Sequence, residues 1–597
     1  MAVSAPRRTA IDVRIERDVP VPLPDGTILR ADVWRPAGGA PAPVLLQRTP
    51  YDKAFSLVVQ AGLDPARAVA AGYAVVVQDV RGRFASDGAF EPFAHEAADG
   101  TATIAWVTQQ PYCDGRVATY GGSYVGATQL LAAAGGAPAL RAMLPHVSTA
   151  EYHRDWMTEG GAFQLGFALS WARSLAAGEL ARREDRGEDI AELQERLDAE
   201  LADPLTGYRR LPLVDQPLMA ELAPYYLEWI AHPTRDGYWR ERSAREGLRG
   251  LAVPALHLGG WHDVFLGGTL ATYSELVERG ATGQRLVVGP WAHGGWGDAV
   301  GEVLYGPEAS RYALDITDLH LAFFNAVLNG HSGVDARDRG RGRGADAAPV
   351  RGRGRSADAA PVRIFVMGAN RWRDEDAWPL ARARRRPLHL RADGALTWEP
   401  PVTGEPTRGY VYDPADPVPT SGGRTLMPGH EASIALGQRD QRPIEARPDV
   451  LVYTTAPLER DLEVTGHVRL VLHAASSAPD TDWTAKLVDV QPDGRALSVA
   501  DGILRARYRG GTDRERLLEP GRPERFTIEV GATSIVFARG HRIRLEVSSS
   551  NFPRFDRNPN TGGVVAQAGE SDLRTARQTV FHDAARASQL ELPIVEH

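Results

Sequence analysis

The 597-residue sequence contains a single cysteine, Cys113, so no internal disulfide bond can form. This permits a reducing compartment, and we expect a cytoplasmic protein. No stretch approaches the roughly 18 uncharged apolar residues of a membrane span. Residues 1–26 carry charge but lack the apolar core of a secretory signal. We therefore expect neither a membrane association nor a signal peptide.

Lysine is almost absent, since Lys53 and Lys486 are the only two in the chain. We attribute this scarcity to coding bias, without functional meaning. The net charge of −8 provides no basic field to attract nucleic acid or anionic lipid. The histidines do not cluster with metal-ligand spacing, so we expect no metal and no cofactor. The sequence leaves a homodimer open.

Short apolar runs alternate with helix-length segments in residues 1–147 and again in residues 242–331. The runs are "APVLLQ", "GYAVVVQD", "RVATYG", "RAMLPHVS", "PALHLGG" and "QRLVVGPW". Two antiparallel strands are expected before them, joined by a turn at residues 24–26. Such alternation predicts an α/β fold with a mostly parallel sheet wrapped by helices.

Residues 148–241 interrupt this alternation with a long segment rich in helix formers. Within it, Ile190, Leu193, Leu197 and Leu201 recur at helical spacing and predict one amphipathic face. A helical insertion between two strands of a sheet is a natural cap over an active site. The alternative is a helical subdomain without a role at the site.

Two further regions follow. Residues 332–361 contain the imperfect duplication "RGRGADAAPVR" and "RGRGRSADAAPVR", and this composition predicts a flexible Arg/Gly/Ala-rich linker. RNA binding by so short a basic segment is disfavoured in an acidic protein. Residues 362–597 hold short strand-like runs with few helices, which predicts a β-sandwich.

The stretch "YGGSYVG" places Ser123 between a predicted strand and a predicted helix. A nucleophile elbow is usually written G-x-S-x-G, in which the serine projects from a strained turn. Here Gly121 lies two residues before the serine, but Val125 lies two after it and the next glycine is Gly126. Gly126 could let the helix pack closely on the sheet. An ordinary glycine-serine turn is the alternative.

A serine nucleophile needs a base, and the base needs an orienting acid. In α/β-hydrolases these follow in the order Ser, Asp or Glu, His. After the cap, one apolar run leads to Asp263 and the next leads to His293. His262 competes as the base but precedes the acid in the chain. Asp79 competes as the acid but precedes the serine, and its neighbour Arg81 instead suggests a buried ion pair that holds the loop.

At these residues the chain resembles the CocE/NonD family of serine hydrolases. The matching stretches are "RTPYDK", "QDVRGRFASDGAFEPF", "YCDGRVATYGGSYVG", "GGWHDVF", "GPWAHGG" and "VRIFVMGANRWRDEDAWP". The family elbow is G-x-S-Y-x-G, so Val125 and Gly126 are normal for it. The resemblance implies an α/β-hydrolase domain in two parts (1–147 and 242–331), a helical cap (148–241) and a C-terminal jelly-roll domain (362–597).

The resemblance also implies roles for individual residues. Ser123 matches the nucleophile, Asp263 the orienting acid and His293 the base. The hydroxyl of Tyr51 and the backbone amide of Tyr124 match the donors of the oxyanion hole.

Three aromatic residues match the acyl pocket of the family esterases. Trp156 and Trp171 stand 15 residues apart (171 − 156), and Phe265 follows two residues after Asp263. For each of them, packing in the core is the alternative.

The expected substrate is a small-molecule ester or a short peptide. Aromatic residues around the pocket favour a carboxylic ester with a bulky hydrophobic acyl group. An X-Pro dipeptidyl-peptidase needs carboxylates for a free amino terminus, for which Asp155 and Glu159 are candidates. An α-amino acid ester hydrolase would carry extra acidic residues beside the triad acid, but only Asp263 is present there. A non-catalytic binding protein on a hydrolase scaffold is the last alternative.

Overall fold

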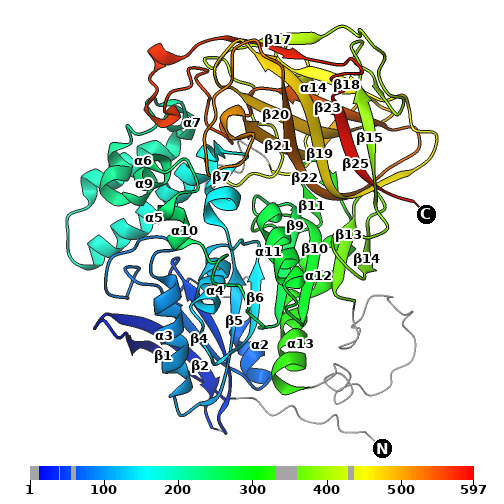
Figure 1. The fold of residues 1–597 in the computed structure, drawn as a ribbon. Helices are drawn as coiled ribbons and strands as arrows, with labels where there is room; N and C mark the ends of the chain where they lie inside the picture. Colours follow the sequence, from blue (N-terminus) through cyan, green and yellow to red (C-terminus); the bar gives the residue numbers. More distant parts are fainter. Residues whose placement is uncertain (1–11, 39, 56–61, 331–359, 428–435, 597) are drawn as a thin grey trace, which may run out of the picture.

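The computed structural model describes residues 12–38, 40–55, 62–330, 360–427 and 436–596 (Figure 1). The predicted linker at 332–361 therefore lies outside the described residues, apart from its last two positions. Figure 1 shows a sheet with flanking helices, a group of helices above it on the left, and a β-rich part above it on the right. In this described part of the chain, no helix is both long enough and apolar enough to cross a bilayer.

The first part is built on a ten-stranded sheet, which is mostly parallel as predicted. In spatial order its strands are β1 (Val13–Pro22), β2 (Ile28–Pro36), β4 (Ala74–Asp79), β3 (Ala42–Thr49), β5 (Cys113–Gly122), β6 (Leu140–His146), β9 (Ala255–His262), β10 (Gln284–Ala292), β13 (Val362–Val366) and β14 (Arg371–Glu375). Neighbours from β4 to β13 pair in parallel, whereas β1, β2 and β14 are antiparallel to their neighbours. The central strands are apolar because helices cover both faces of such a sheet.

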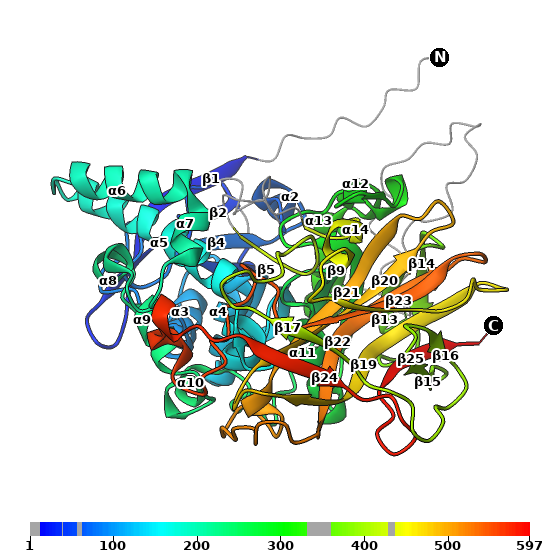
Figure 2. The ribbon, with the colours of Figure 1, turned by 90° about the horizontal axis from the view of Figure 1, so that it is seen from above.

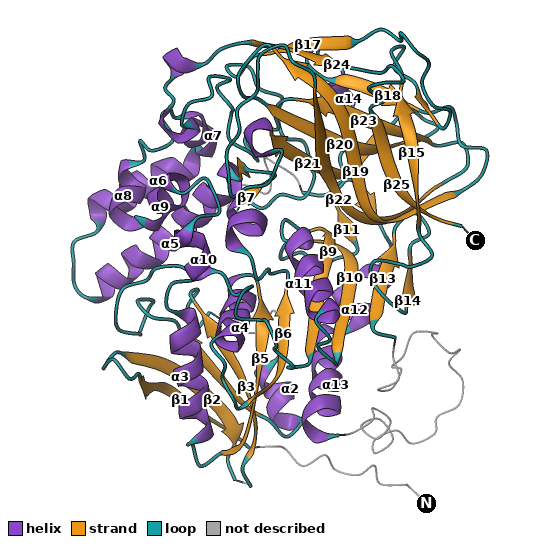
Figure 3. Ribbon diagram, viewed as in Figure 1, coloured by secondary structure: helices purple, strands orange, loops and turns teal. Residues whose placement is uncertain are grey.

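Helices flank this sheet, and two small antiparallel strands follow β10. These elements are α2 (Pro65–Ala70), α3 (Glu96–Thr108), α4 (Tyr124–Ala134), α11 (Leu266–Glu278), α12 (Arg311–Leu314) and α13 (Ile316–Asn329), with β11 (Ala299–Val300), β12 (Val303–Leu304) and the 3₁₀ turn η2 (Pro307–Ala309). Figure 3 shows β5 and β6 running upward, so their carboxyl ends face the cap and the β-rich part.

The predicted helical cap lies between β6 and β9 in the chain. It opens with a π-helical turn and a short hairpin and continues with six helices: η1 (His153–Met157), β7 (Thr158–Glu159), β8 (Ala162–Phe163), α5 (Leu165–Asp185), α6 (Ala191–Ala202), α7 (Pro204–Arg209), α8 (Pro217–Leu222), α9 (Tyr225–Ala231) and α10 (Gly237–Arg242). On and beside α6, Leu197 is buried and Ile190, Leu193 and Leu201 pack partly buried against the same core, so the predicted amphipathic face is confirmed.

The C-terminal part is an antiparallel β-sandwich (Figure 2). One sheet holds β16 (Leu396–Thr397), β15 (Arg384–Leu390), β25 (Gln589–Val595), β19 (Leu462–Ser476), β24 (Ala576–Val580) and β17 (Arg408–Tyr412), with β22 (Glu524–Phe537) also paired to β19. The other holds β18 (Leu451–Thr454), β23 (Arg542–Ser548), β20 (Asp482–Val490) and β21 (Ala496–Arg505). The short helical elements are α14 (Arg442–Glu445), η3 (Ala506–Tyr508), η4 (Val565–Gln567) and η5 (Glu570–Asp572).

The start of the C-terminal part differs from the prediction at residues 362–375. These residues were assigned to the sandwich, but β13 pairs in parallel with β10 and β14 pairs with β13, so both extend the first sheet. The physical reason is that the edge of β10 is a row of unpaired backbone groups, which β13 satisfies. The chain enters the sandwich only after β14.

Candidate active site

Ser123 occupies a strained turn between β5 and α4, as an elbow requires. Its backbone lies at φ 59° and ψ −128°, a conformation that a non-glycine residue rarely adopts. The Ser123 amide donates to the carbonyl of His146 on β6 over 3.0 Å, which anchors the turn. Gly121 precedes it at φ 129°, and a Cβ there would lie 2.3 Å from Cγ1 of Val125. The local sequence therefore folds so that the Ser123 hydroxyl projects from the end of β5.

Asp263 and His293 form a hydrogen-bonded pair after β9 and β10. The Nδ1 atom of His293 lies 3.2 Å from Oδ2 of Asp263, whose side chain is fully buried. The other carboxylate oxygen accepts the amide of Phe265 at 2.5 Å. A carboxylate on Nδ1 places the imidazole proton there and leaves Nε2 as the basic nitrogen. The His293 side chain is 11% exposed, so that nitrogen lies near the edge of the buried region.

The order of the strands brings these residues to one edge of the sheet. Strands β5, β6, β9 and β10 are consecutive neighbours and all run in parallel. Ser123, Asp263 and His293 each follow the carboxyl end of one of them, which is where open α/β sheets bind ligands.

Tyr51, in the loop after β3, lies directly against Ser123. Its hydroxyl accepts the indole Nε1–H of Trp171 at 3.1 Å, and the Ser123 side chain lies near enough to lower the pKa of the phenol. Burial raises the pKa of Tyr51 to about 12, so the phenol stays protonated in neutral solution. The amide of Tyr124 is the first of α4, where the helix supplies no acceptor. Both predicted oxyanion donors thus flank the serine.

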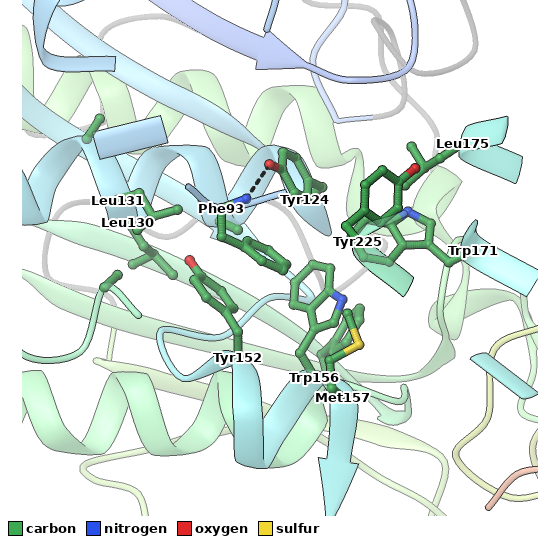
Figure 4. Close-up of a cluster of buried hydrophobic side chains, with 14 of the residues drawn as sticks. Phe93, Tyr124, Leu130, Leu131, Tyr152, Trp156, Met157, Trp171, Leu175 and Tyr225 are labelled. Carbon is green, nitrogen blue, oxygen red and sulfur yellow. Dashed lines mark hydrogen bonds between the residues drawn. The ribbon is translucent and has the colours of Figure 1, made fainter. Parts of the chain in front are cut away.

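Aromatic rings connect the two ends of the site. The ring of Phe265 meets His293 edge-on, with centroids 5.2 Å apart, and stacks on Trp156 at 4.2 Å. Trp156 in turn contacts Trp171 at 5.6 Å, and Trp171 donates to Tyr51. We call Trp156, Phe167, Trp171 and Phe265 the aromatic box. Figure 4 shows Trp156 and Trp171 among the buried aromatic side chains around Tyr124.

Comparisons with known proteins show the family to which the chain belongs. A family model described as X-Pro dipeptidyl-peptidase (S15 family) matches residues 25–295, and one described as X-Pro dipeptidyl-peptidase C-terminal non-catalytic domain matches residues 355–591. Cocaine esterase of Rhodococcus sp. strain MB1 is 40% identical over 595 residues, covering 98% of this chain and 99% of that protein. This chain belongs to the CocE/NonD family of serine hydrolases.

Solved structures resemble this serine hydrolase over its whole length. An α-amino acid ester hydrolase superposes with a TM-score of 0.80 at 26% identity, covering 99% of this chain and 98% of that one. An aminopeptidase from a marine-sediment Thaumarchaeota archaeon gives 0.79 at 27% identity, covering 100% and 98%. The family and fold predicted from the sequence motifs are confirmed.

The serine hydrolase contains contacts at the site that sequence reasoning missed. Phe167 stacks on Trp171 with ring centroids 5.8 Å apart, and Trp229 also stacks on Trp171, with centroids 5.3 Å apart. The i, i+4 spacing of Phe167 and Trp171 on a predicted helix was a usable signal. No comparable signal marks Trp229, because α9 is far from α5 in the chain.

The side chain of Tyr124 has a role that the sequence did not suggest. Its hydroxyl donates to Oε1 of Glu96 at 3.0 Å and accepts the amide of Phe93 at 2.8 Å, the bond drawn in Figure 4. Glu96 is paired with Arg48 at 2.8 Å, and both are buried. Burial raises the pKa of Glu96. This network fixes the side chain of the residue that directly follows Ser123.

The two competing residues are occupied elsewhere. Nε2 of His262 lies 2.9 Å from the hydroxyl of Tyr305, and burial lowers the pKa of His262 to about 4. The predicted Asp79–Arg81 ion pair is wrong. Arg81 pairs with Asp99 at 2.7 Å. Asp79 instead pairs with Lys53.

The ion pair of Asp79 with Lys53 holds the loop that carries Tyr51. The Nζ atom of Lys53 lies 3.3 Å from Oδ2 of Asp79, and the Lys53 amide donates to Oδ1 at 2.7 Å. Burial raises the pKa of Asp79 to about 6, against the opposing pull of Lys53. Arg81 is nearer to Asp79 in sequence than Lys53 is, but the parallel pairing of β3 with β4 brings Lys53 closer to Asp79 in space.

The two carboxylates considered for binding a free amino terminus are already paired. Asp155 accepts two bonds from Arg154, at 2.9 and 2.7 Å. Glu159 is held by Arg424 at 3.1 Å and by Arg554 at 2.7 Å. Neither is left as an uncompensated negative charge for a substrate ammonium group.

Proposed function

We propose that this serine hydrolase is a carboxylesterase that cleaves esters with a bulky hydrophobic acyl group through Ser123, His293 and Asp263. The observation that carries the proposal is the aromatic box, which runs unbroken from His293 to Tyr51. The four rings are 0–4% exposed and belong to one buried cluster, and we propose that the acyl group packs against them, which would remove its apolar surface from water. The similarity to a protein named cocaine esterase supports an ester substrate.

In the first half-reaction, Nε2 of His293 takes the hydroxyl proton as Oγ of Ser123 attacks the ester carbonyl. The negative charge that develops on the carbonyl oxygen is held by the hydroxyl of Tyr51 and the amide of Tyr124. Asp263 keeps the imidazole oriented and stabilises its cation. Collapse of the tetrahedral intermediate expels the alcohol, which receives the proton from His293.

In the second half-reaction, water replaces the alcohol. His293 removes a proton from that water as it attacks the acyl-enzyme, and the same two donors hold the second oxyanion. Release of the acid returns the proton to Ser123. The acyl group stays against the aromatic box throughout, so the box selects the acid portion of the ester.

An X-Pro dipeptidyl-peptidase is the second candidate, because both matching family models carry that description. The paired state of Asp155 and Glu159 favours the ester, since a dipeptide substrate needs a negative group for its free amino terminus. Beside Asp263 the chain offers Val264 and Phe265, which also disfavours an α-amino acid ester. The cytoplasmic location and the homodimer remain predictions.

Hydrolysis of p-nitrophenyl esters by the wild type and by Ser123→Ala tests the proposal. We expect the variant to lose about 10⁶-fold in kcat and to escape labelling by a fluorophosphonate probe. An X-Pro-p-nitroanilide assayed in parallel separates the two candidates. Faster turnover of the anilide than of every ester would replace the esterase by the peptidase.

A further inference from the structure

The hairpin of β7 and β8, residues 158–163, joins the aromatic box to the sandwich. Trp156 lies just before it in the chain and Phe167 lies just after it. We propose that Glu159 on this hairpin, held by Arg424 and Arg554, is a positioning residue that sets the selectivity for the acyl group. This inference rests on the proposed esterase function.

The hairpin backbone is bonded directly to the sandwich. The amide of Arg505 donates to the carbonyl of Gly160 at 2.9 Å. Phe163 and Asp556 exchange two bonds, from the Phe163 amide to Oδ1 at 3.1 Å and from the Asp556 amide to the Phe163 carbonyl at 3.0 Å. The approach is close, because a Cβ at Gly160 would lie 2.0 Å from the carbonyl oxygen of Ile503. The tip of the hairpin is therefore held in a single position against the sandwich.

Charge fixes the hairpin further. Arg424 and Arg554 are buried, 4% and 1% exposed, and bond separate oxygens of the Glu159 carboxylate. Arg554 also bonds the carboxylate of the buried Asp501, and the guanidinium of Arg424 donates to the Asp501 carbonyl and lies 3.9 Å from its carboxylate. Two guanidinium groups thus face two carboxylates, and the group is neutral as a whole. Without the charge of Glu159, one positive charge of the two buried arginines would be left uncompensated. The structure could relieve this only if the hairpin shifted or water entered.

A shift of the hairpin would reach the box through short, stiff connections. The amide of Gln164 donates to the carbonyl of Met157 at 2.9 Å, and its side chain donates to the carbonyl of Trp156 at 2.9 Å. These bonds tie the base of the hairpin into one unit with Trp156. The amide of Gly166 donates to the carbonyl of Pro553 at 2.9 Å, so the start of α5 is also set by the sandwich.

The backbone segments that carry the reacting groups are anchored outside this unit. Ser123 is held by β6, the Asp263–His293 pair follows β9 and β10, and the loop of Tyr51 is held by Asp79. Loosening the hairpin should therefore lower kcat/KM for an ester whose acyl group fills the box. It should leave kcat/KM unchanged for an ester whose acyl group is too small to reach the box. If Glu159 had only a structural role, its substitution would lower the kcat/KM values of both esters in proportion.

The test compares Glu159→Gln with the wild type in kcat/KM for p-nitrophenyl benzoate and p-nitrophenyl acetate, at a temperature where both proteins are folded. We expect the benzoate-to-acetate ratio to fall about tenfold or more, as expected for a disturbed pocket contact. The acetate rate and fluorophosphonate labelling should change little.

The matched control is Asp480→Asn. Asp480, like Glu159, is a carboxylate held by an arginine, with Arg507 at 2.8 Å and Asn558 at 2.8 Å, but it is fully buried and its partners lie within the sandwich. This isosteric change should lower the Tm and leave the ratio at the wild-type value. A fall of the ratio in the control would assign the effect to general loosening and overturn the inference.

Arg424→Gln is the second variant, in case Glu159→Gln does not fold, because it keeps the pair of Glu159 with Arg554. Its ratio should fall in the same direction. A folded, labelled variant of either kind with the wild-type ratio overturns the inference while the esterase proposal stands. A wild type that cleaves neither ester overturns the esterase proposal, and this inference with it.

Discussion

The hydroxyl of Tyr51 depends on a neighbour for its direction. Because Trp171 donates to the phenol oxygen, the phenol's own hydrogen is left to bond the developing oxyanion. Tyr51→Phe removes that donor and keeps the ring. We expect kcat to fall about 10²- to 10³-fold with little change in KM, because the bond strengthens only in the transition state. Steady-state kinetics with a p-nitrophenyl ester measures both.

Tyr120→Phe is the control for this substitution. Tyr120 lies on β5 three residues before the serine, and its buried hydroxyl has no hydrogen-bond partner among the described residues. Its removal should leave kcat unchanged. Wild-type kcat in Tyr51→Phe would remove the phenol from the oxyanion hole.

Lys53 makes a second residue-scale prediction, one that depends on pH. Lys53→Met leaves the buried carboxylate of Asp79 without its counter-ion, at a cost of about 3–5 kcal/mol when that carboxylate is charged. The pKa of Asp79 is already raised to about 6, above its unfolded value, so protonation stabilises the folded state as the pH falls. In the variant this pKa rises further, and the proton is taken up at higher pH.

The stability deficit of Lys53→Met should therefore be larger at about pH 8 than at about pH 5.5. Thermal unfolding of variant and wild type at both pH values measures it. Lys53→Arg keeps the charge and should show a smaller deficit with little dependence on pH. A deficit that grows as the pH falls would contradict the assigned pairing.

At the scale of elements, the contact of α4 with β6 depends on Gly126. A Cβ at this position would lie 2.6 Å from Cβ of Ser148 and 3.2 Å from the carbonyl oxygen of His146. The helix that begins at the nucleophile would have to move off the sheet. We expect Gly126→Ala to destabilise the protein by about 1–3 kcal/mol, measured by urea unfolding, and to lower kcat.

Gly267→Ala in α11 is the matched helical control, because a Cβ there meets nothing within 4 Å. Alanine has the higher helix propensity, so this change should be neutral or stabilising. Equal destabilisation by both substitutions would show that close packing of α4 is not the cause.

The sequence predicted elements where the signal is local. The apolar runs of β3, β4, β5, β6, β9 and β10 and the helical face of α6 were recognised from their periodicity. Strand β13 was assigned to the wrong sheet, because its partner β10 is separated from it by about 70 positions, and a short apolar strand has the same pattern in either sheet. Pairing between distant strands is a property of the fold, which periodicity does not encode.

The same distinction applies to single residues. Asp263 and His293 were found because each follows an apolar run, in the order that the reaction requires. The partner of Asp79 was missed because Arg81 is nearer in sequence than Lys53. The scarcity of lysine was read as meaningless, yet both lysines are buried in polar networks, Lys53 with Asp79 and Lys486 with Gln441.

At the scale of the whole molecule, the sandwich shares its core with the first sheet. One buried cluster includes Trp261 and Ile364 of the sheet together with Leu470 and Phe526 of the sandwich. The backbone of Met367 continues this contact. It donates to the carbonyl of Ser534 at 2.9 Å and accepts the amide of Val536 at 2.8 Å. The cap is joined to the same sandwich through the hairpin of β7 and β8. Neither the cap nor the first sheet can therefore separate from the sandwich without exposing apolar surface.

This shared core makes a prediction about unfolding. Chains of several domains commonly unfold in separate steps. Here separation of the sandwich would expose the apolar cluster around Trp261 and would strand the buried charges of Arg424 and Arg554, each at a large free-energy cost. We therefore expect one main calorimetric transition, at the temperature where near-ultraviolet circular dichroism and esterase activity are also lost. Loss of activity well below that transition, with a separate heat-absorption peak, would show that the sandwich unfolds on its own.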